Sequence, residues 1–266
     1  MASPARDRAK AERIDRPGLP RKQIVTVTLP ALIACDVDGT LLDLAHTPDA
    51  VVVPKDLQQA LVRLHEELNG ALAFVSGRSL LTIDRLFSPL RTAAIGCHGA
   101  EVRGADGKVR ALCGPVANDI RALFHDLTKR HPGVILEDKF FTLALHYRLA
   151  PEARPGLVAA LEQHAELLAA EGIVLMAGKS VIEARMAGID KGVGFRALIA
   201  EKPFAGRRAL FGGDDTTDLD VFRILPELGG VGFSVGRHFP GVEHAFASPR
   251  AVRQWLVRLA REGVAA

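Results

Sequence analysis

The sequence predicts an α/β protein: a doubly wound parallel sheet forms the core, and an α+β domain is inserted into it. Short apolar runs alternate with amphipathic helical stretches at both ends of the chain, whereas the middle combines hairpin signals with helices. Polar clusters directly follow several apolar runs, as in sheets that bind ligands at the carboxyl ends of their strands. We therefore expect a core at 25–103 and 188–266, an inserted domain at 104–187, and a disordered extension at 1–24.

The first part of the core is predicted as alternating strands and helices. In chain order we expect a strand at 31–35, a helix at 54–68, a strand at 71–75, a helix at 79–87 and a strand at 93–95. Leu57, Leu61 and Leu64 give the first helix an apolar face, and Pro54 suits its first turn. The three apolar runs are short and end in turn residues, which is typical of buried strands.

The inserted domain and the second part of the core follow. In the insertion we expect a hairpin at 105–108, a helix at 120–130, a strand at 139–149, a helix at 155–171 and strands at 173–176 and 181–186. After it we expect a helix at 191–200, a strand at 208–211, a helix at 217–224, a strand at 231–235 and a helix at 249–261. Gly104 and Gly188 are candidate hinges between the two domains.

The composition excludes several classes of protein. Lys and Arg number 34 against 31 Asp and Glu, and no aromatic-rich basic stripe is visible, which argues against nucleic-acid binding. Three cysteines without a Cys-x-x-Cys pair argue against a disulfide framework or a zinc site and favour the cytoplasm. No apolar stretch approaches the ~20 residues of a membrane span, and the N-terminus lacks a secretory signal. No long heptad pattern is present, so we expect a monomer.

Two acidic clusters carry the predicted chemistry. The first contains Asp36, Asp38, Gly39 and Thr40, and the second contains Asp214, Asp215 and Asp218. Carboxylates this close repel one another unless a cation or protons intervene, and Mg²⁺ is a natural partner. Gly39 lets the chain leave the extended conformation, so that Asp36 and Asp38 can share one site. One carboxylate could then attack phosphorus while the other handles the leaving-group proton.

These segments resemble the four motifs of HAD phosphatases, in the same order. The matching strings are Asp36-Val-Asp-Gly-Thr40, Ser76-Gly-Arg78, Lys191-Gly192 and Gly213-Asp-Asp-x-x-Asp218. Further strings resemble the trehalose-phosphatase family of that superfamily: Gly96-Cys-His-Gly-Ala-Glu101, Glu137-Asp-Lys139, His146-Tyr-Arg148 and Glu183. The chain departs from the family at Arg185 and Met186, where Lys-Pro is common, and at Leu219, where an acid is usual.

The resemblance implies a HAD-like core with a cap domain and a role for each catalytic residue. Asp36 would be the nucleophile that forms an aspartyl-phosphate, and Asp38 would be the general acid and base. Mg²⁺ would be held by Asp36, by the backbone carbonyl of Asp38 and by Asp214. Ser76 and Lys191 would bind the phosphate. Asp215 and Asp218 would support Lys191 or outer waters.

The resemblance also implies a substrate and a partner. The reaction would be the magnesium-dependent hydrolysis of trehalose 6-phosphate, and a trehalose-6-phosphate synthase would be a partner. A disaccharide offers many hydroxyl groups, which convergent charged side chains can bind. The candidate substrate-binding residues are Arg78, His98, Glu101, Arg103, Glu137, Lys139, His146, Arg148 and Glu183.

Other functions remain open at this point. A phosphatase for sucrose phosphate or mannosylglycerate phosphate would use the same chemistry, and so would a capped phosphomutase. Glu137, Lys139, His146 and Arg148 favour trehalose phosphate over these. A non-catalytic domain that binds a sugar phosphate and regulates a partner is a further alternative, but the intact catalytic set argues against it.

Overall fold

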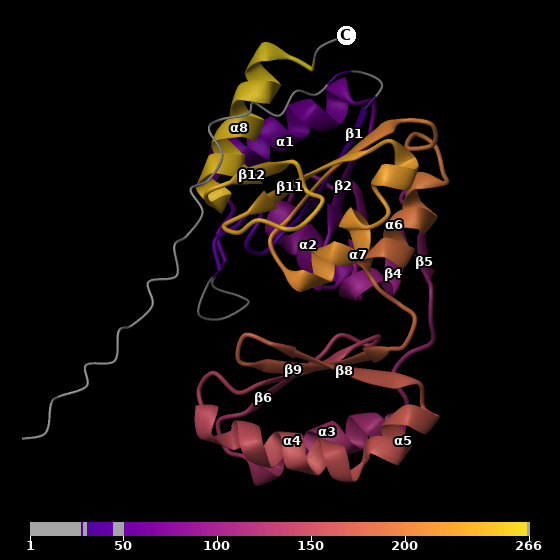
Figure 1. Cartoon of the computed structure of the whole chain (residues 1–266), viewed down its shortest axis with the longest axis vertical. Coiled ribbons are helices and arrows are strands. Elements are labelled where there is room, and N and C mark those ends of the chain that lie inside the picture. Colours follow the sequence, from indigo (N-terminus) through magenta and orange to yellow (C-terminus); the bar gives the residue numbers. More distant parts are fainter. Residues whose placement is uncertain (1–27, 29–30, 45–50, 265–266) are drawn as a thin grey trace, which may run out of the picture.

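The computed structural model describes residues 28, 31–44 and 51–264. The extension predicted at 1–24 lies outside these residues. Figure 1 shows a larger core domain and a smaller cap domain, and the sheet of the cap faces the core while its helices lie on the far side. Within the described residues, no helix has both the length and the apolar character needed to cross a bilayer.

The core contains an eight-stranded sheet in the order β12-β11-β10-β1-β2-β3-β4-β5. The strands are β1 (Ala31–Asp36), β2 (Leu72–Val75), β3 (Ala93–Gly96), β4 (Glu101–Arg103), β5 (Val109–Ala111), β10 (Arg208–Gly213), β11 (Val231–Val235) and β12 (His244–Phe246). Neighbours from β12 to β3 are parallel, and β4 and β5 are antiparallel additions. The predicted fold class is confirmed.

Helices cover both faces of this sheet, which explains why its central strands are apolar throughout. The helices are α1 (Lys55–Glu67), α2 (Leu80–Phe87), α6 (Lys191–Ile199), α7 (Leu219–Phe222) and α8 (Pro249–Glu262). Helices α1 and α8 pack together on one side, and α6 and α7 lie together on the other. All six residues of β1 are buried, and Phe74, Phe211 and Phe233 fill the core around it.

The cap is a four-stranded antiparallel sheet in the order β6-β7-β9-β8, backed by three helices. Its elements are α3 (Asn118–Arg130), β6 (Ile135–Asp138), β7 (Leu143–His146), α4 (Arg154–Gln163), α5 (Ala165–Ala170), β8 (Ile173–Gly178) and β9 (Val181–Met186). Leu145 and Ile182 belong to the apolar core of the cap. Side chains alternate along a strand, so His146 and Glu183 point to the opposite face, toward the core domain.

Three predictions about the cap region were wrong in detail. The strand predicted at 139–149 is shorter, because only Leu143–His146 (β7) forms a strand there. Its hairpin partner β6 was not predicted, and Phe140, in a left-handed conformation (φ 72°), lies in the turn between the two strands. The helix predicted at 155–171 is two helices, which meet at His164. The hairpin at 105–108 joins β4 to β5 and thus belongs to the core sheet, so the insertion begins after β5 and not at residue 104.

Candidate active site

Carboxylates from two neighbouring strands meet at the carboxyl ends of the parallel strands of the core sheet. Asp36 is the last residue of β1, and Asp214 directly follows β10, the parallel neighbour of β1. Asp218 lies one turn beyond Asp214, in a 3₁₀ segment. One ligand atom from each of these three residues lies within 4.8 Å of the others. Parallel topology therefore gathers the two acidic clusters of the sequence into one site.

A buried lysine bridges two carboxylates of this cluster. Lys191 is the first residue of α6, and its Nζ donates to Asp36 Oδ1 and to Asp218 Oδ1, both at 2.7 Å. The residue is only 2% exposed. Burial alone would lower the pKa of Lys191, but the two carboxylates outweigh it and raise that pKa far above its ordinary value. Lys191 is therefore a fixed positive charge beside the candidate nucleophile.

The two aspartates that were predicted to support Lys191 behave differently. Asp218 is fully buried, and its Oδ2 accepts hydrogen bonds from the backbone N–H groups of Asp214 and Asp215, both at 2.9 Å. This leaves its Oδ1 for Lys191. Asp215 instead is exposed and accepts from Arg237 at 2.9 Å. Asp218 thus contacts Lys191, whereas Asp215 pairs with Arg237.

Gly39 and Thr40 shape the site from the other cluster. The φ of Gly39 is +87°, and a Cβ at this position would lie 2.2 Å from Asp214 Oδ2, so only glycine fits. Thr40 Oγ1 donates to Asp214 Oδ1 at 3.1 Å. Both residues therefore fix the carboxylate of Asp214 beside Asp36.

The electrostatics of the cluster fit a divalent cation. Burial is the main cause that raises the pKa of Asp36 well above its usual range; Lys191 opposes the shift, and Asp218 and Asp214 add to it. Burial, with the charge of Asp218, also raises the pKa of Asp214 to about 6. Ionised carboxylates this close repel one another, a bound divalent cation compensates their charge, and Mg²⁺ takes oxygen ligands of this kind. The donor set therefore fits the predicted ion.

Asp38, the candidate acid and base, is held by an arginine. Arg78 donates from Nε to Asp38 Oδ2 at 2.5 Å and from Nη2 to Asp38 Oδ1 at 2.8 Å. This bidentate geometry fixes the orientation of the carboxylate. Arg78 was predicted to bind substrate, and in the structure it contacts the candidate acid and base Asp38.

The Ser76–Arg78 segment follows β2 and forms a tight loop. Ser76 is 1% exposed, and its Oγ accepts from the backbone N–H of Arg78 at 3.1 Å. The backbone carbonyls of Ser76 and Arg78 accept from the N–H groups of His98 (3.0 Å) and Cys97 (2.9 Å). Cys97 and His98 both have left-handed φ values, 48° and 54°. A strained turn therefore holds the candidate phosphate-binding loop, which is a common feature of functional sites.

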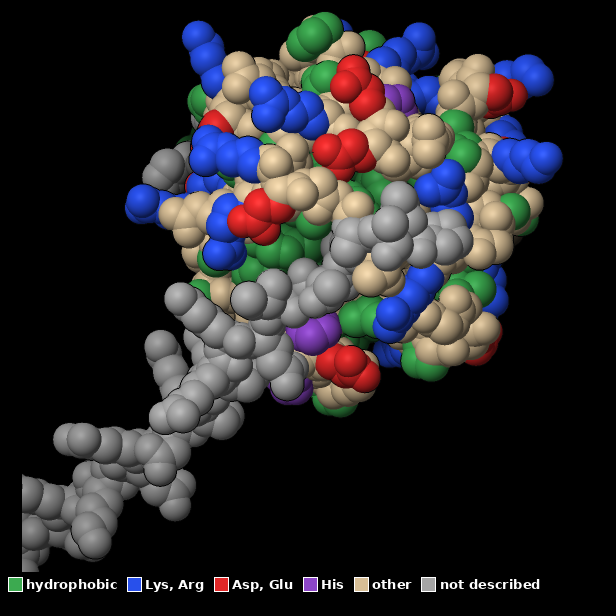
Figure 2. All heavy atoms as spheres, turned by 90° about the horizontal axis from the view of Figure 1, so that it is seen from above, with side chains coloured by type: hydrophobic (Ala, Val, Ile, Leu, Met, Phe, Trp, Pro, Cys, Tyr) green, Lys and Arg blue, Asp and Glu red, His purple; other side chains and the backbone are tan. Residues whose placement is uncertain are grey.

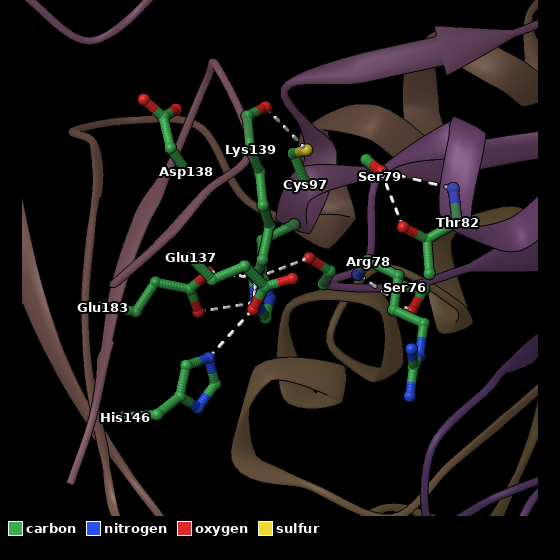
Figure 3. A network of polar contacts seen from close by, with 12 residues as sticks. Ser76, Arg78, Ser79, Thr82, Cys97, Glu137, Asp138, Lys139, His146 and Glu183 are labelled. Atoms are coloured by element: carbon green, nitrogen blue, oxygen red, sulfur yellow. Dashed lines mark hydrogen bonds and ion pairs between the residues drawn. The ribbon is translucent and has the colours of Figure 1, made fainter. Parts of the chain in front are cut away.

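The cap places a network of charged side chains over this loop (Figure 3). Lys139 Nζ donates to Glu183 Oε1 at 2.8 Å, and His98 Nε2 from the core lies 2.8 Å from Glu183 Oε2. Glu137 Oε2 lies 2.9 Å from His146 Nε2 and 3.8 Å from Lys139 Nζ. Burial acts to raise the pKa of Glu183, but His98 and Lys139 hold it well below its usual range. The structure thus brings five of the predicted substrate-binding residues together.

Three other predicted substrate-binding residues have different surroundings. Arg103 is 2% exposed and donates to both carboxylate oxygens of Asp84 and to the carbonyl of Thr92, so it is a core residue out of reach of a sugar. Glu101 accepts from the backbone N–H of Leu80 at 2.7 Å, at the start of α2. Arg148 is exposed beyond the end of β7.

Sequence reasoning assigned no role to three residues of the site. Gly77 contributes a backbone carbonyl that accepts from Lys139 Nζ at 3.1 Å. Cys97 Sγ lies 3.4 Å from Glu101 Oε1 and 3.7 Å from the carbonyl of Lys139. Arg185 follows Glu183 on the same face of β9, and its Nε and Nη1 are buried without a hydrogen-bond partner. The motif strings contain Gly77 and Cys97, but nothing in the sequence signals their contacts.

The surface agrees with the modest net charge of +3. Figure 2 shows the end of the core domain, where Lys and Arg side chains are spread over the visible face with acidic side chains among them. The three cysteines are free.

Comparison with known proteins gives the family. A family model described as trehalose-phosphatase matches residues 34–251. A probable trehalose-phosphate phosphatase of Sinorhizobium fredii is 42% identical over 217 residues, which cover 81% of this chain and 82% of that protein. The trehalose-6-phosphate phosphatase of Escherichia coli is 36% identical over 223 residues, 83% of each chain.

A solved structure gives the same result. A trehalose-6-phosphate phosphatase related protein superposes with a TM-score of 0.75 at 26% identity, and the match covers 88% of this chain and 99% of that one. The chain belongs to the trehalose-phosphatase family of HAD-like phosphatases and is a phosphoric monoester hydrolase.

Proposed function

We propose that the protein hydrolyses trehalose 6-phosphate to trehalose and phosphate, with Asp36 as the nucleophile and Mg²⁺ as the cofactor. The observation that carries this proposal is the juxtaposition of two sites. Asp36, the buried nucleophile beside Lys191, lies at the carboxyl end of β1. The paired charges of the cap lie over the adjoining Ser76–Arg78 loop. The first site suits a phosphoryl group, and the second suits the hydroxyl groups of a sugar.

The chemistry requires two steps. In the first, a carboxylate oxygen of Asp36 forms a bond to phosphorus while the bond from phosphorus to the sugar oxygen breaks, and Asp38 protonates that oxygen. In the second, Asp38 takes a proton from water, whose oxygen attacks phosphorus and releases phosphate from Asp36. Arg78 supports both steps because it fixes the orientation of Asp38. Lys191 and Ser76 bind the oxygens of the phosphoryl group.

The side chains of Asp36 and Asp214 and the backbone carbonyl of Asp38 would hold Mg²⁺. When bound, the ion supplies positive charge that stabilises the phosphoryl oxygens. Lys191 supplies a second, permanent charge to the same oxygens. Asp218 keeps Lys191 in place through its hydrogen bond of 2.7 Å.

The substrate follows from the cap. Glu137, Lys139, His146 and Glu183 offer carboxylates and cations on one surface, the combination that binds vicinal hydroxyl groups. The names of the relatives from S. fredii and E. coli support trehalose 6-phosphate over another glycosyl phosphate. A trehalose-6-phosphate synthase would be the partner that supplies this substrate.

The test is phosphate release from trehalose 6-phosphate with and without Mg²⁺. Sucrose 6-phosphate, glucose 6-phosphate and an Asp36→Asn variant are assayed in parallel. We expect magnesium-dependent release from trehalose 6-phosphate, at least tenfold faster than from the other two sugars, and none from the variant. Faster release from another sugar phosphate would support the proposed mechanism but contradict the proposed substrate. Binding without release from any of them would indicate a regulatory domain.

A further inference from the structure

Lys139 connects the cap to the phosphate loop of the core. It follows β6 in the cap, and its Nζ donates to the backbone carbonyl of Gly77 at 3.1 Å. Gly77 lies between Ser76 and Arg78, the residue that holds Asp38. A cation from the cap domain therefore bonds directly to the backbone between two residues of the candidate active site.

The three backbone carbonyls of this loop are all engaged. The turn at Cys97 and His98 donates to the carbonyls of Arg78 and Ser76, and these contacts stay within the core domain. The carbonyl of Gly77 is bonded by Lys139 instead, so this contact depends on the cap. A Cβ at Gly77 would lie 2.2 Å from His98 Nε2, so the loop is also pressed against that ring.

The other contacts of Lys139 hold it in this position. Its ammonium donates to Glu183 Oε1 at 2.8 Å, and its backbone carbonyl lies 3.7 Å from Cys97 Sγ. Glu183 is in turn tied to the core by His98 at 2.8 Å. The side chain of Lys139 is 11% exposed. An ammonium has three N–H donors, so the bonds to Gly77 and Glu183 leave one for a sugar hydroxyl.

We propose that Lys139 is a positioning residue for the phosphate loop, in addition to its proposed contact with the sugar. By bonding the carbonyl of Gly77 it fixes the loop between Ser76 and Arg78 when the cap lies against the core. Turnover of any phosphate monoester, including one without a sugar, therefore depends on this cap lysine. The inference rests on the proposed phosphatase chemistry but not on the identity of the sugar.

The experiment compares Lys139→Met with wild type on p-nitrophenyl phosphate, which has no sugar, and on trehalose 6-phosphate. A role in sugar binding alone would leave p-nitrophenyl phosphate hydrolysis unchanged. We expect kcat/KM for p-nitrophenyl phosphate to fall about tenfold, the effect of one hydrogen bond from a charged donor. Lys139→Arg should recover part of the loss. Lys129→Met, the same change at an exposed position of cap helix α3, is the control and should match wild type.

Two further measurements separate the contact with Gly77 from side effects. The double variant Lys139→Met/Glu183→Gln removes the carboxylate that Lys139 leaves behind, and it should stay as slow as Lys139→Met. The affinity of the magnesium-loaded protein for inorganic phosphate, measured by calorimetry, should fall in parallel. The proposal is overturned if Lys139→Met hydrolyses p-nitrophenyl phosphate and binds phosphate within twofold of wild type, or if the double variant recovers wild-type turnover. A protein that hydrolyses p-nitrophenyl phosphate but not trehalose 6-phosphate would discard the proposed substrate and leave this test intact.

Discussion

Replacing Lys191 by Met removes the ammonium that contacts both Asp36 and Asp218 at 2.7 Å. Breaking a buried ion pair from one side costs about 3–5 kcal/mol, because a buried charge is left without compensation. For a protein of this size, 1 kcal/mol changes Tm by about 2–4 °C, so we expect a fall of about 10 °C. Phosphate release should also be lost, since Lys191 is the permanent cation beside the proposed nucleophile, Asp36.

The fall in Tm should depend on pH in a defined direction. Without Lys191, the pKa of Asp36 rises further above its value in the unfolded chain. A carboxyl group whose pKa is raised by folding destabilises the protein progressively as pH rises above the unfolded value, about 4. The difference between variant and wild type should therefore be larger at pH 8 than at pH 5.

The assay is thermal unfolding in EDTA at both pH values. Lys55→Met is the matched control, because Lys55 is also the first residue of a helix but is exposed. We expect this control to unfold within about 2 °C of wild type, as surface substitutions usually do. If Lys191→Met did so too at pH 8, the ion pairs of Lys191 would contribute no net stability and the reasoning would be refuted.

Three further predictions concern single carboxylates. Asp36→Asn should lower phosphate release by about 10³-fold or more while the protein stays folded, and a folded variant with activity near wild type would contradict the nucleophilic role. Asp214→Asn should raise the Mg²⁺ concentration required for half-maximal activity about tenfold or more, and an unchanged magnesium titration would remove Asp214 from the ion's ligands. Folding depresses the pKa of Glu183, so the stability that its carboxylate adds to the protein is present above about pH 4.5 and is lost as pH falls. Glu183→Gln should therefore show a smaller drop in Tm between pH 6 and pH 4 than wild type. Equal drops would contradict a stabilising role for the ion pairs of Glu183.

The fold of the core was predictable because its signals are local. Each parallel strand is a short apolar run that ends in a turn residue, and these runs recover β1, β2 and β10. The rule that ligands bind at the carboxyl ends of such strands then brings Asp36 and Asp214 together, although they are 178 positions apart in the sequence. The cap was harder, because its hairpin depends on one left-handed residue, Phe140, that a strand pattern does not reveal.

The pairing of charges within the site was not predictable from the sequence. Arg78 and Arg103 were both predicted to bind the substrate. In the structure Arg78 pairs with Asp38, and Arg103 is buried in an ion pair with Asp84. These choices depend on side-chain geometry across 40 and 19 positions of sequence, and local patterns carry no information about such contacts.

The charges of the candidate site support the proposed need for a cation in addition to Lys191. Four carboxylates surround the end of β1: Asp36, Asp38, Asp214 and Asp218. Lys191 and Arg78 supply only two positive charges against them. A phosphate monoester brings up to two further negative charges, so without compensation the site would repel its substrate. Burial makes this worse, because it removes the water that would screen the repulsion. The two positive charges of Mg²⁺ would bring the net charge of the site to zero, and the phosphoryl group would then enter a site that does not repel it.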